Sequence, residues 1–307
     1  MSIQTSLKIS VCVCTYKRPQ LLVKLLDSLY EQSFPLNEFE VIVVDNDLSG
    51  SARRVVEESM QLHPALEVSY DIEPVQGISY ARNRTVALAR GELLAFIDDD
   101  ECANQCWLQD LVHTMDACNA DAVLGPVVSQ YPVATSAWVI RSGFFDRPRF
   151  VTGTVIRSEA CRTGNALVMA AKVKSRQPKP FDDCYAQTGG EDQDLFRWLE
   201  DQGCRFVWCD QAVVQEEVPE DRLSLGYMLE RGVRGSSSYW QIINQKRSRT
   251  SAVGEAILGV GIGVAFAVWG LCVLPVGLHR SVRNWVVSAK GFGRVVALTE
   301  YKLTGYR

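Results

Sequence analysis

The stretch Leu93-Leu-Ala-Phe-Ile-Asp-Asp-Asp-Glu101 joins a short apolar run directly to four acidic residues. An uninterrupted apolar run of this length is typical of a strand buried on both faces of a parallel sheet. The four carboxylates that follow would repel one another if they were left unpaired in a crevice. A divalent cation relieves that repulsion, and Mg²⁺ or Mn²⁺ usually bridges one or two carboxylates to substrate phosphates. The alternative interpretation is a solvated acidic turn.

The sequence around this stretch predicts strands that alternate with helices. This order implies an α/β fold with a mostly parallel sheet and helices on both faces. Ligands of such sheets bind outside the carboxyl ends of the strands, so we expect Thr15, Asp45 and the acidic run to meet at one crevice. The predicted strands are Ile9–Thr15, Phe39–Val44, Leu66–Ile72, Leu93–Ile97 and Ala122–Val128; the predicted helices are Leu21–Leu29, Ser51–Gln61, Ile78–Arg90, capped by Gly91, and Trp107–Cys118.

A second acidic site lies in Thr188-Gly-Gly-Glu-Asp-Gln-Asp194, which opens a predicted helix. The glycines allow close backbone approach, and the carboxylates lie near the positive end of the helix dipole. One acidic residue would suffice for capping alone. The pair Glu191 and Asp192 therefore predicts a site in which a carboxylate acts as general base on an acceptor hydroxyl.

Two arginines, Arg231 and Arg234, lie three residues apart on a helix predicted to begin near Leu223. This spacing places them on one helix face. Two guanidinium groups on one face are suited to bind the diphosphate of a leaving group. A solvated basic face is the alternative.

Other phosphate-binding motifs are absent from the sequence, because no G-x-G-x-x-G follows the first strand and no G-x-x-x-x-G-K-[ST] occurs. A Rossmann dehydrogenase and a P-loop kinase are therefore disfavoured, and a metal ion must hold the diphosphate. The net charge is −4, although Lys246 to Arg307 holds nine basic and only two acidic residues. The acidic body argues against a nucleic-acid partner, and the basic tail favours an anionic membrane surface.

The tail contains a segment that resembles a membrane helix. Residues 256–278 hold no ionisable side chain except a thiol, a length that can span a bilayer of about 30 Å. Basic residues flank both ends, so both ends read as cytoplasmic under the positive-inside rule. We expect this segment to span or to re-enter the membrane, followed by an interfacial amphipathic helix at about 280–298. That helix has Arg280, Arg283, Lys290 and Arg294 on one arc and Val282, Trp285, Val286, Ala289, Phe292 and Val296 on the other. The predicted domains are thus 1–245, catalytic, and 246–307, membrane-associated.

Six motifs in register resemble those of bacterial glycosyltransferases of family 2, which have the GT-A fold. The resemblance covers roughly residues 8 to 240, and within the family the chain is most similar to the exopolysaccharide glucosyltransferase branch. The motifs are Cys14-Thr-Tyr-Lys-Arg-Pro19, Val43-Val-Asp-Asn46, Gly77-Ile-Ser-Tyr-Ala-Arg-Asn83, Phe96-Ile-Asp-Asp-Asp100, Thr163-Gly-Asn165 and Gly190-Glu-Asp192.

The resemblance implies direct displacement from a nucleotide-diphosphate sugar, with inversion at the anomeric carbon. Asp192 would be the base, and Glu191 would orient the acceptor or the sugar. Asp98 and Asp100 would hold Mn²⁺ or Mg²⁺, with Glu216 as a third metal contact where many relatives have a His. The implied nucleotide-sugar site comprises Thr15, Tyr16, Arg18, Asp45, Arg82, Asn83, Asp98, Asp99, Arg231 and Arg234.

The resemblance also shapes what we expect of the acceptor. The Q-x-x-R-W motif of processive synthases is absent, which favours transfer of one sugar at each visit. A lipid-linked saccharide acceptor would explain a membrane anchor, and it would place the catalytic domain at the cytoplasmic face of the inner membrane. The alternatives are a metal-dependent nucleotidyltransferase and a membrane-tethered subunit that has lost its chemistry.

Overall fold

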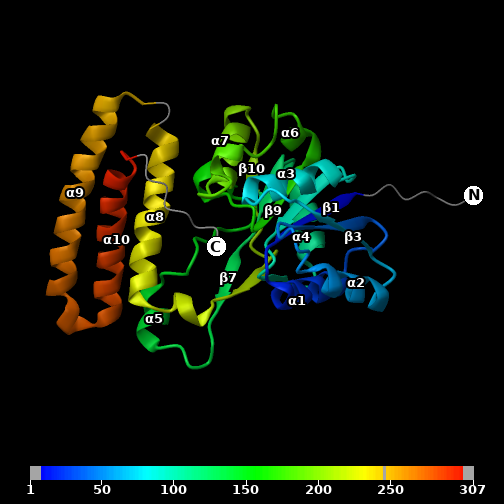
Figure 1. The fold of residues 1–307 in the computed structure, drawn as a ribbon, viewed down its shortest axis with the longest axis horizontal. Helices are drawn as coiled ribbons and strands as arrows, with labels where there is room; N and C mark the ends of the chain where they lie inside the picture. Colours follow the sequence, from blue (N-terminus) through cyan, green and yellow to red (C-terminus); the bar gives the residue numbers. More distant parts are fainter. Residues whose placement is uncertain (1–7, 245–246, 300–307) are drawn as a thin grey trace, which may run out of the picture. The chain divides into compact units, whose positions relative to one another are not determined.

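The computed structural model describes residues 8–244 and 247–299, which form two compact units. The first unit comprises the chain up to Val128 together with Arg147–Gln187 and Glu191–Glu216. The second comprises Ser129–Asp146, Thr188–Gly190 and the chain from Glu217 onward. Figure 1 labels the elements of both.

The first unit is built on a sheet whose strands, within the described residues, lie in the order β3-β2-β1-β4-β9-β6-β10-β8. Neighbours β3, β2, β1 and β4 are parallel, as are β6 and β10, whereas β9 runs antiparallel to both β4 and β6. The bounds are β1 Ile9–Thr15, β2 Phe39–Asp45, β3 Glu67–Ile72, β4 Leu93–Ile97, β6 Ala122–Leu124, β8 Val155–Ile156, β9 Asn165–Met169 and β10 Phe206–Trp208.

Helices cover both faces of this sheet. Alternate side chains of the central strand β1 enter two separate hydrophobic cores, since Val11 and Val13 pack in one and Cys12 in the other. The first core includes α1 (Pro19–Tyr30), α2 (Arg53–Leu62) and α4 (Trp107–Cys118). The second includes α3 (Ile78–Leu88), α6 (Ala170–Lys174) and α7 (Glu191–Asp201). The predicted α/β fold with helices on both faces is confirmed.

Two local predictions are wrong for steric reasons. The strand predicted over Ala122–Val128 is interrupted at Gly125, where an added Cβ would lie 2.5 Å from Asn165 Nδ2. Helix α3 ends at Leu88, so Gly91 does not cap it. Gly91 instead allows close approach to β1, because a Cβ there would lie 2.6 Å from the Ser10 nitrogen.

A small second sheet has the order β5-β11-β7, with β5 at Glu101–Ala103, β11 at Val214–Glu217 and β7 at Val127–Gln130. Strand β11 runs antiparallel to β5, and Glu216 pairs with Glu101 in this register. The acidic run after β4 thus leads directly into a strand. The short 3₁₀ helices are η1 Ser158–Ala160, η2 Asp183–Tyr185, η3 Glu220–Arg222 and η4 Leu274–Val276.

The second unit contains the long helices α8 (Leu225–Asn244), α9 (Arg249–Cys272) and α10 (Leu278–Val296), with the short helix α5 (Ala137–Ser142). Helix α10 packs against both α8 and α9 (Figure 1). The predicted domain boundary after residue 245 falls between α8 and α9, inside this unit. The assignment of α8 to a catalytic domain therefore stays a prediction.

Candidate active site

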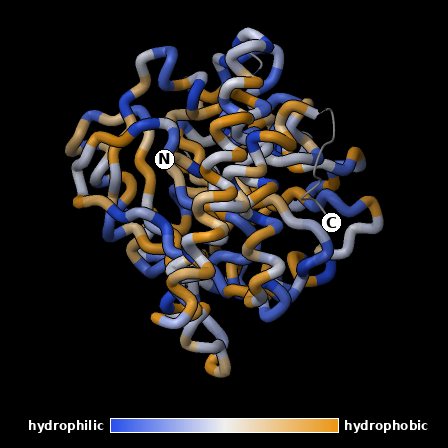
Figure 2. The backbone as a smooth tube through the Cα atoms, turned by 90° about the vertical axis from the view of Figure 1, so that its left-hand side faces the viewer, coloured by the Kyte–Doolittle hydropathy of each residue, from blue (hydrophilic) through white to orange (hydrophobic). Residues whose placement is uncertain are grey.

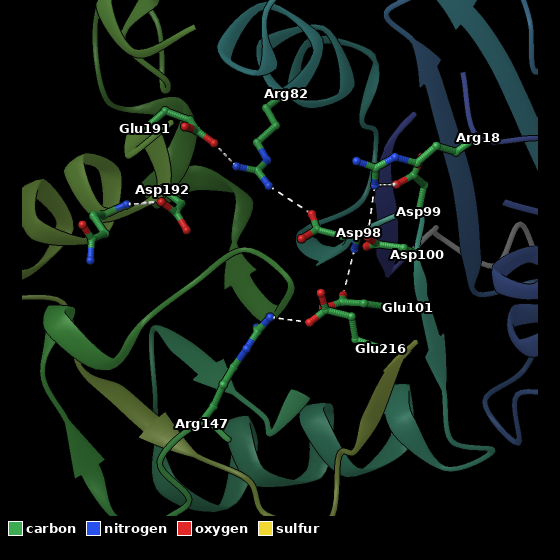
Figure 3. A network of polar contacts seen from close by, with 11 residues as sticks. Arg18, Arg82, Asp98, Asp99, Asp100, Glu101, Arg147, Glu191, Asp192 and Glu216 are labelled. Atoms are coloured by element: carbon green, nitrogen blue, oxygen red, sulfur yellow. Dashed lines mark hydrogen bonds and ion pairs between the residues drawn. The ribbon is translucent and has the colours of Figure 1, made fainter. Parts of the chain in front are cut away.

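The carboxyl ends of β1 and β4 meet at the acidic run. Thr15 closes β1, and its Oγ1 donates a hydrogen bond to Asp99 Oδ2 at 2.7 Å. Arg18, in the turn after β1, contacts Asp99 Oδ1 at 3.3 Å and Asp100 Oδ2 at 3.0 Å. One strand end therefore supplies a hydroxyl and a cation to the carboxylates of the other, and Figure 3 shows Arg18 beside Asp99 and Asp100.

The surroundings of Asp99 and Asp100 make ionisation of their carboxyl groups less favourable than it is in water. Burial raises the pKa of Asp99, and Arg18 and Thr15 oppose the rise. Burial, together with Asp98, Asp99 and Glu216, raises the pKa of Asp100 to about 7. Like charges in a desolvated crevice account for the direction.

The Glu101 side chain, at the end of the acidic run, folds back onto the first residue of the run, Asp98. Its Oε2 accepts a hydrogen bond from the Asp98 backbone nitrogen at 2.9 Å, and the residue is 1% exposed. Burial and the nearby Asp98 carboxylate raise its pKa well above the usual value. Gly164 makes this position possible, because a Cβ there would lie 2.7 Å from Glu101 Oε1. Glu101 is not among the predicted site residues. Its place as the fourth acidic residue of the run is the signal that points to it.

Arg82 connects the acidic run to the second acidic site. Its two terminal nitrogens bind Asp98 Oδ1, at 3.0 Å, and Glu191 Oε1. Arg82 lies on α3 and is 8% exposed, so its ion pair with the buried Glu191 is shielded from water, whereas the Asp98 side chain is 45% exposed. Figure 3 shows the guanidinium between the two carboxylates. Residues far apart in the sequence thus share one cation.

Glu191 and Asp192 begin helix α7. Glu191 is buried, and within the part of the chain that the structure describes its Oε2 has no hydrogen-bond partner. Burial and the adjacent Asp192 raise the pKa of Glu191, and Arg82 opposes the rise. Asp192 is only partly buried, and its Oδ1 accepts the Gln193 backbone N–H at 2.7 Å. Asp192 is therefore the more accessible carboxylate of the pair.

The candidate metal ligands differ in their surroundings. The Asp98 side chain is 45% exposed, whereas that of Asp100 is 12% exposed. Glu216 accepts a hydrogen bond from Arg147 at 2.6 Å. No group of three or more His, Cys, Asp or Glu side chains within residues 8–244 and 247–299 is arranged as a metal site. The donor chemistry of Asp98 and Asp100 nonetheless fits Mg²⁺ or Mn²⁺, which take one or two carboxylates and complete their coordination with water and phosphate.

Asp45 and Asn83 make structural contacts at the same edge. The Asp45 carboxylate is fully buried and accepts hydrogen bonds from the Asp47 and Ala52 nitrogens and the Tyr70 hydroxyl. The Asn83 amide exchanges two hydrogen bonds with the Phe181 backbone, at 2.7 and 2.9 Å. Both residues therefore shape the site, and their direct contact with a nucleotide stays a prediction.

The remaining predicted residues lie in different places. Tyr16 follows Thr15 in the turn after β1, and Lys17 Nζ lies 5.0 Å from the centroid of its ring. Arg231 and Arg234 lie on α8 of the second unit, where each contacts a residue one turn earlier. Those partners are Tyr227 Oη and Glu230 Oε1. A role of the two arginines in diphosphate binding stays a prediction.

Asn165, the last residue of the motif Thr163-Gly-Asn165, is a buried hydrogen-bond centre. Its Oδ1 accepts the Trp107 indole N–H at 2.8 Å, and its Nδ2 donates to the Pro126 and Ala212 carbonyls. These bonds connect β9 to the start of α4, to Pro126 between β6 and β7, and to Ala212 just before β11. The motif Thr163-Gly-Asn165 thus helps to hold the acidic run in place, because Gly164 lies against Glu101 and Asn165 connects β9 to the surrounding segments.

Comparison with known proteins gives a consistent result. Residues 10–164 match the model of the family described as glycosyl transferase family 2. The succinoglycan biosynthesis protein ExoM of Rhizobium meliloti (strain 1021) is 35% identical over 87% of this chain and 85% of its own length. Glycosyltransferase AglE of Haloferax volcanii is 31% identical over 40% of each chain.

Solved structures have the same fold. Mannosyltransferase PcManGT from Pyrobaculum calidifontis, in complex with GDP-Man and Mn²⁺, has a TM-score of 0.65 at 19% identity and covers 94% of this chain and 86% of its own. S. aureus TarS 1-349, in complex with UDP-GlcNAc, has a TM-score of 0.55 at 20% identity, covering 92% and 89%. The predicted GT-A fold is confirmed.

Proposed function

The chain belongs to glycosyl transferase family 2, and from this premise we propose that it moves a sugar from a nucleotide-diphosphate sugar to a lipid-linked saccharide, with inversion at the anomeric carbon. The product would belong to an exopolysaccharide or another cell-envelope polymer, in line with the name of the relative from Rhizobium meliloti. Nucleotide sugars and Mn²⁺ in solved structures of the same fold support the donor class and the metal.

One observation carries this proposal: Arg82 binds Asp98 and Glu191 at the same time. Asp98 belongs to the acidic run, where the diphosphate and metal are expected, and Glu191 adjoins the predicted base. The shared cation holds the donor side and the acceptor side of the reaction in one buried network. A bound sugar placed between them would have its anomeric carbon near both.

The proposed reaction is a single displacement. Asp192 accepts the proton of the acceptor hydroxyl while that oxygen forms a bond to the anomeric carbon. The bond from this carbon to the diphosphate oxygen breaks, and a nucleoside diphosphate leaves. A divalent ion held by Asp98 and Asp100 would supply the positive charge that a leaving diphosphate requires. Arg18 and Arg82 keep the carboxylates of the acidic run in place.

Membrane attachment is the third part of the proposal. Among the described residues, α9 is the one helix long and apolar enough to cross a membrane, with a mean hydropathy of 1.9 over its most apolar part. We assign the second unit the task of holding the enzyme at the cytoplasmic face of the cell membrane, where lipid-linked intermediates are elongated.

The test is a transfer assay with the full-length protein, a panel of labelled nucleotide sugars and lipid extracts from a polysaccharide-producing bacterium. We expect label in the lipid fraction together with an equal amount of nucleoside diphosphate. Asp192→Asn should lower turnover about 10²- to 10⁴-fold. Asp116→Asn, an exposed carboxylate on α4, is the matched control and should leave turnover unchanged. Release of pyrophosphate in place of a nucleoside diphosphate would instead indicate nucleotidyl transfer.

A further inference from the structure

Helix α9 packs against α10 through a seam of glycines. A Cβ at Gly259 would lie 2.5 Å from the Gly291 carbonyl oxygen, and one at Gly270 would lie 2.3 Å from Trp285 Nε1. Between them, the Gly263 carbonyl accepts a hydrogen bond from Ser288 Oγ at 2.7 Å. Gly259 and Gly291 therefore bring the two backbones into contact, and the contact of Gly270 with the Trp285 side chain extends the packing toward the end of α9.

A salt bridge closes one end of this seam. Glu255, the one acidic residue of α9, contacts Arg294 of α10 at 2.9 Å and Arg247 at 3.3 Å. The Arg294 guanidinium also lies over the Trp240 ring, 4.7 Å from its centroid. The contact therefore includes α8, and α9 is an integral part of the helical unit.

The rest of α9 is apolar and exposed. Of the most hydropathic part of the helix, 22% is buried. Figure 2 is viewed from the side on which α9 lies in Figure 1, and the helix there is mostly hydrophobic. The exposed large side chains of this outer face, continued into η4, are Val253, Ile257, Leu258, Val260, Val264, Phe266, Val268, Trp269, Leu271, Leu274 and Val276. An exposed apolar surface of this extent is not expected on a soluble protein unless an apolar partner covers it.

Helix α10 is amphipathic, and both apolar and basic side chains of it make contacts inside the unit. Arg283 donates to the Ser142 and Arg141 carbonyls at the end of α5, at 2.7 and 2.9 Å. Of the four cations predicted on one arc of α10, Arg283 and Arg294 thus bind protein groups, and the interfacial position of this helix stays a prediction. Arg280 and Lys290 stay exposed.

These contacts restrict how α9 can meet a membrane. If α9 crossed the hydrocarbon core with its seam intact, α10 would cross beside it and carry Arg280, Arg283 and Lys290 into lipid. Charged side chains inside a membrane are energetically costly. A helix that lies along the interface incurs no such cost, because only its outer face enters the acyl layer.

We propose that α9 lies lengthwise in the cytoplasmic leaflet of an anionic bilayer, with its outer face in the acyl layer and its seam with α10 closed, and that it does not cross the membrane. The same helical unit also exposes Arg247 and Arg249 near the start of α9 and Arg280 and Lys290 on α10, and these cations complement anionic headgroups. This inference deepens the membrane attachment in the proposed function and is independent of sugar transfer.

The first test is flotation of the full-length protein with vesicles of phosphatidylglycerol and phosphatidylethanolamine. The triple variant Ile257→Ser, Val264→Ser, Val268→Ser changes only the outer face, and we expect its vesicle-bound fraction to fall at least tenfold. The matched control replaces exposed apolar residues elsewhere, Met60→Ser, Leu62→Ser and Val133→Ser, and should float like wild type. Binding to phosphatidylcholine vesicles should be weaker than binding to the anionic vesicles.

Several outcomes would overturn the proposal. If the triple variant still floats but changes from dimer to monomer in light scattering, the outer face is an interface between copies of the chain. Equal flotation of all three proteins would show that the outer face does not bind lipid. Because flotation requires no donor or acceptor, its failure is distinguishable from failure of the transfer assay.

The second test separates lying in the membrane from crossing it. Arg280→Cys, combined with Cys272→Ser, places a thiol in the first turn of α10, beside the turn that follows α9 and outside the outer face. We expect a membrane-impermeant maleimide to label this position in inside-out vesicles and not in right-side-out vesicles, as measured on the isolated peptide. Labelling from the outer side would show that the α9–α10 hairpin spans the membrane.

Discussion

Two strand ends of the sheet, on either side of β1, hold acidic residues in opposite ways. At the end of β2, Asp45 is buried, and its carboxylate accepts three hydrogen bonds from Asp47, Ala52 and Tyr70. At the end of β4, Asp100 is almost as buried and accepts a hydrogen bond from Arg18, with further carboxylates close by. The first carboxylate accepts hydrogen bonds from three donors, whereas burial and the neighbouring like charges raise the pKa of the second to about 7.

The difference distinguishes an acid whose hydrogen bonds are complete without a ligand from an acid whose repulsion a ligand would relieve. Buried polar groups in folded proteins are normally paired, and an under-compensated cluster needs a reason. A cation and a diphosphate would relieve the repulsion at β4, while nothing at β2 requires a ligand. Substitutions at the two ends should therefore differ in the sign of their effect on stability.

The largest effect is expected for Asp100→Asn. Removing a predicted metal ligand should lower turnover at least about 10²-fold in the transfer assay, because substitutions even beyond the ligand shell commonly cost 10- to 100-fold in metal affinity. The ligand-free variant should melt above wild type, since one of the repelling charges is gone. Asp116→Asn should change neither value. A lower melting temperature for Asp100→Asn would refute the asserted repulsion.

Asp45→Ala should have the opposite effect on stability. The substitution leaves two backbone N–H groups and the Tyr70 hydroxyl without their acceptor, at a cost of about 1–3 kcal/mol for each group that stays buried. We expect a loss of about 3 kcal/mol in the free energy of unfolding, measured by urea denaturation. Tyr70→Phe, which removes one of the three hydrogen bonds, should lose about 1 kcal/mol. An unchanged stability of Asp45→Ala would contradict the structural role.

Glu40, at the start of β2, offers a pH-dependent test of the same logic. Burial raises its pKa, but hydrogen bonds from Arg90 and Ser10 outweigh burial and hold the pKa below the usual value. A lowered pKa in the folded state stabilises the protein above the unfolded-state pKa of about 4.3, and this contribution disappears as the pH falls. Glu40→Gln should therefore cost about 1–2 kcal/mol at pH 7. Urea denaturation across pH should show wild type and variant converging below about pH 4; a difference that grows at low pH would be inconsistent.

The smallest effect is expected for Thr15→Val, which removes the hydroxyl that donates to Asp99. The loss of one hydrogen bond to a charged group should cost about 1.5–3 kcal/mol in a well-compensated site and less here, where Arg18 still contacts Asp99. We expect about 1 kcal/mol in the free energy of unfolding, with the Michaelis constant for the donor raised. Improved stability of this variant would show that Asp99 is not ionised in the ligand-free protein.

The sequence predicts β4 and the acidic run well, because the signals for both are local. The apolar run before Asp98 and the acids after it lie on adjacent residues, and β4 was predicted at its observed bounds. What it missed depends on contacts between distant segments. The sequence does not predict strand β9, and it predicts Gly91 as a helix cap, which is wrong. It also does not reveal the hydrogen bonds of Asn165 to Trp107, Pro126 and Ala212.

The Arg82 bridge and the α9–α10 seam show the same limit. The pairing of Arg82 with Glu191 joins residues more than a hundred positions apart, which no periodicity reveals. The apolar length of α9 suggested a membrane segment, but only the packing of Gly259 on Gly291 shows that α10 accompanies it. Charge and hydropathy located the functional regions, and tertiary contacts determined how each residue is used.

The most direct test of the central claim, that the acidic run binds a metal-diphosphate, is the melting temperature of the full-length protein with UDP, GDP, CDP or dTDP, each with and without Mn²⁺. A nucleotide at about 100 times its dissociation constant adds roughly 2.7 kcal/mol, which raises the melting temperature by about 4 °C for a protein of this size. We predict a rise of this order with one nucleotide, dependent on Mn²⁺ and absent from Asp100→Asn. An equal rise without metal, or in Asp100→Asn, would contradict the account.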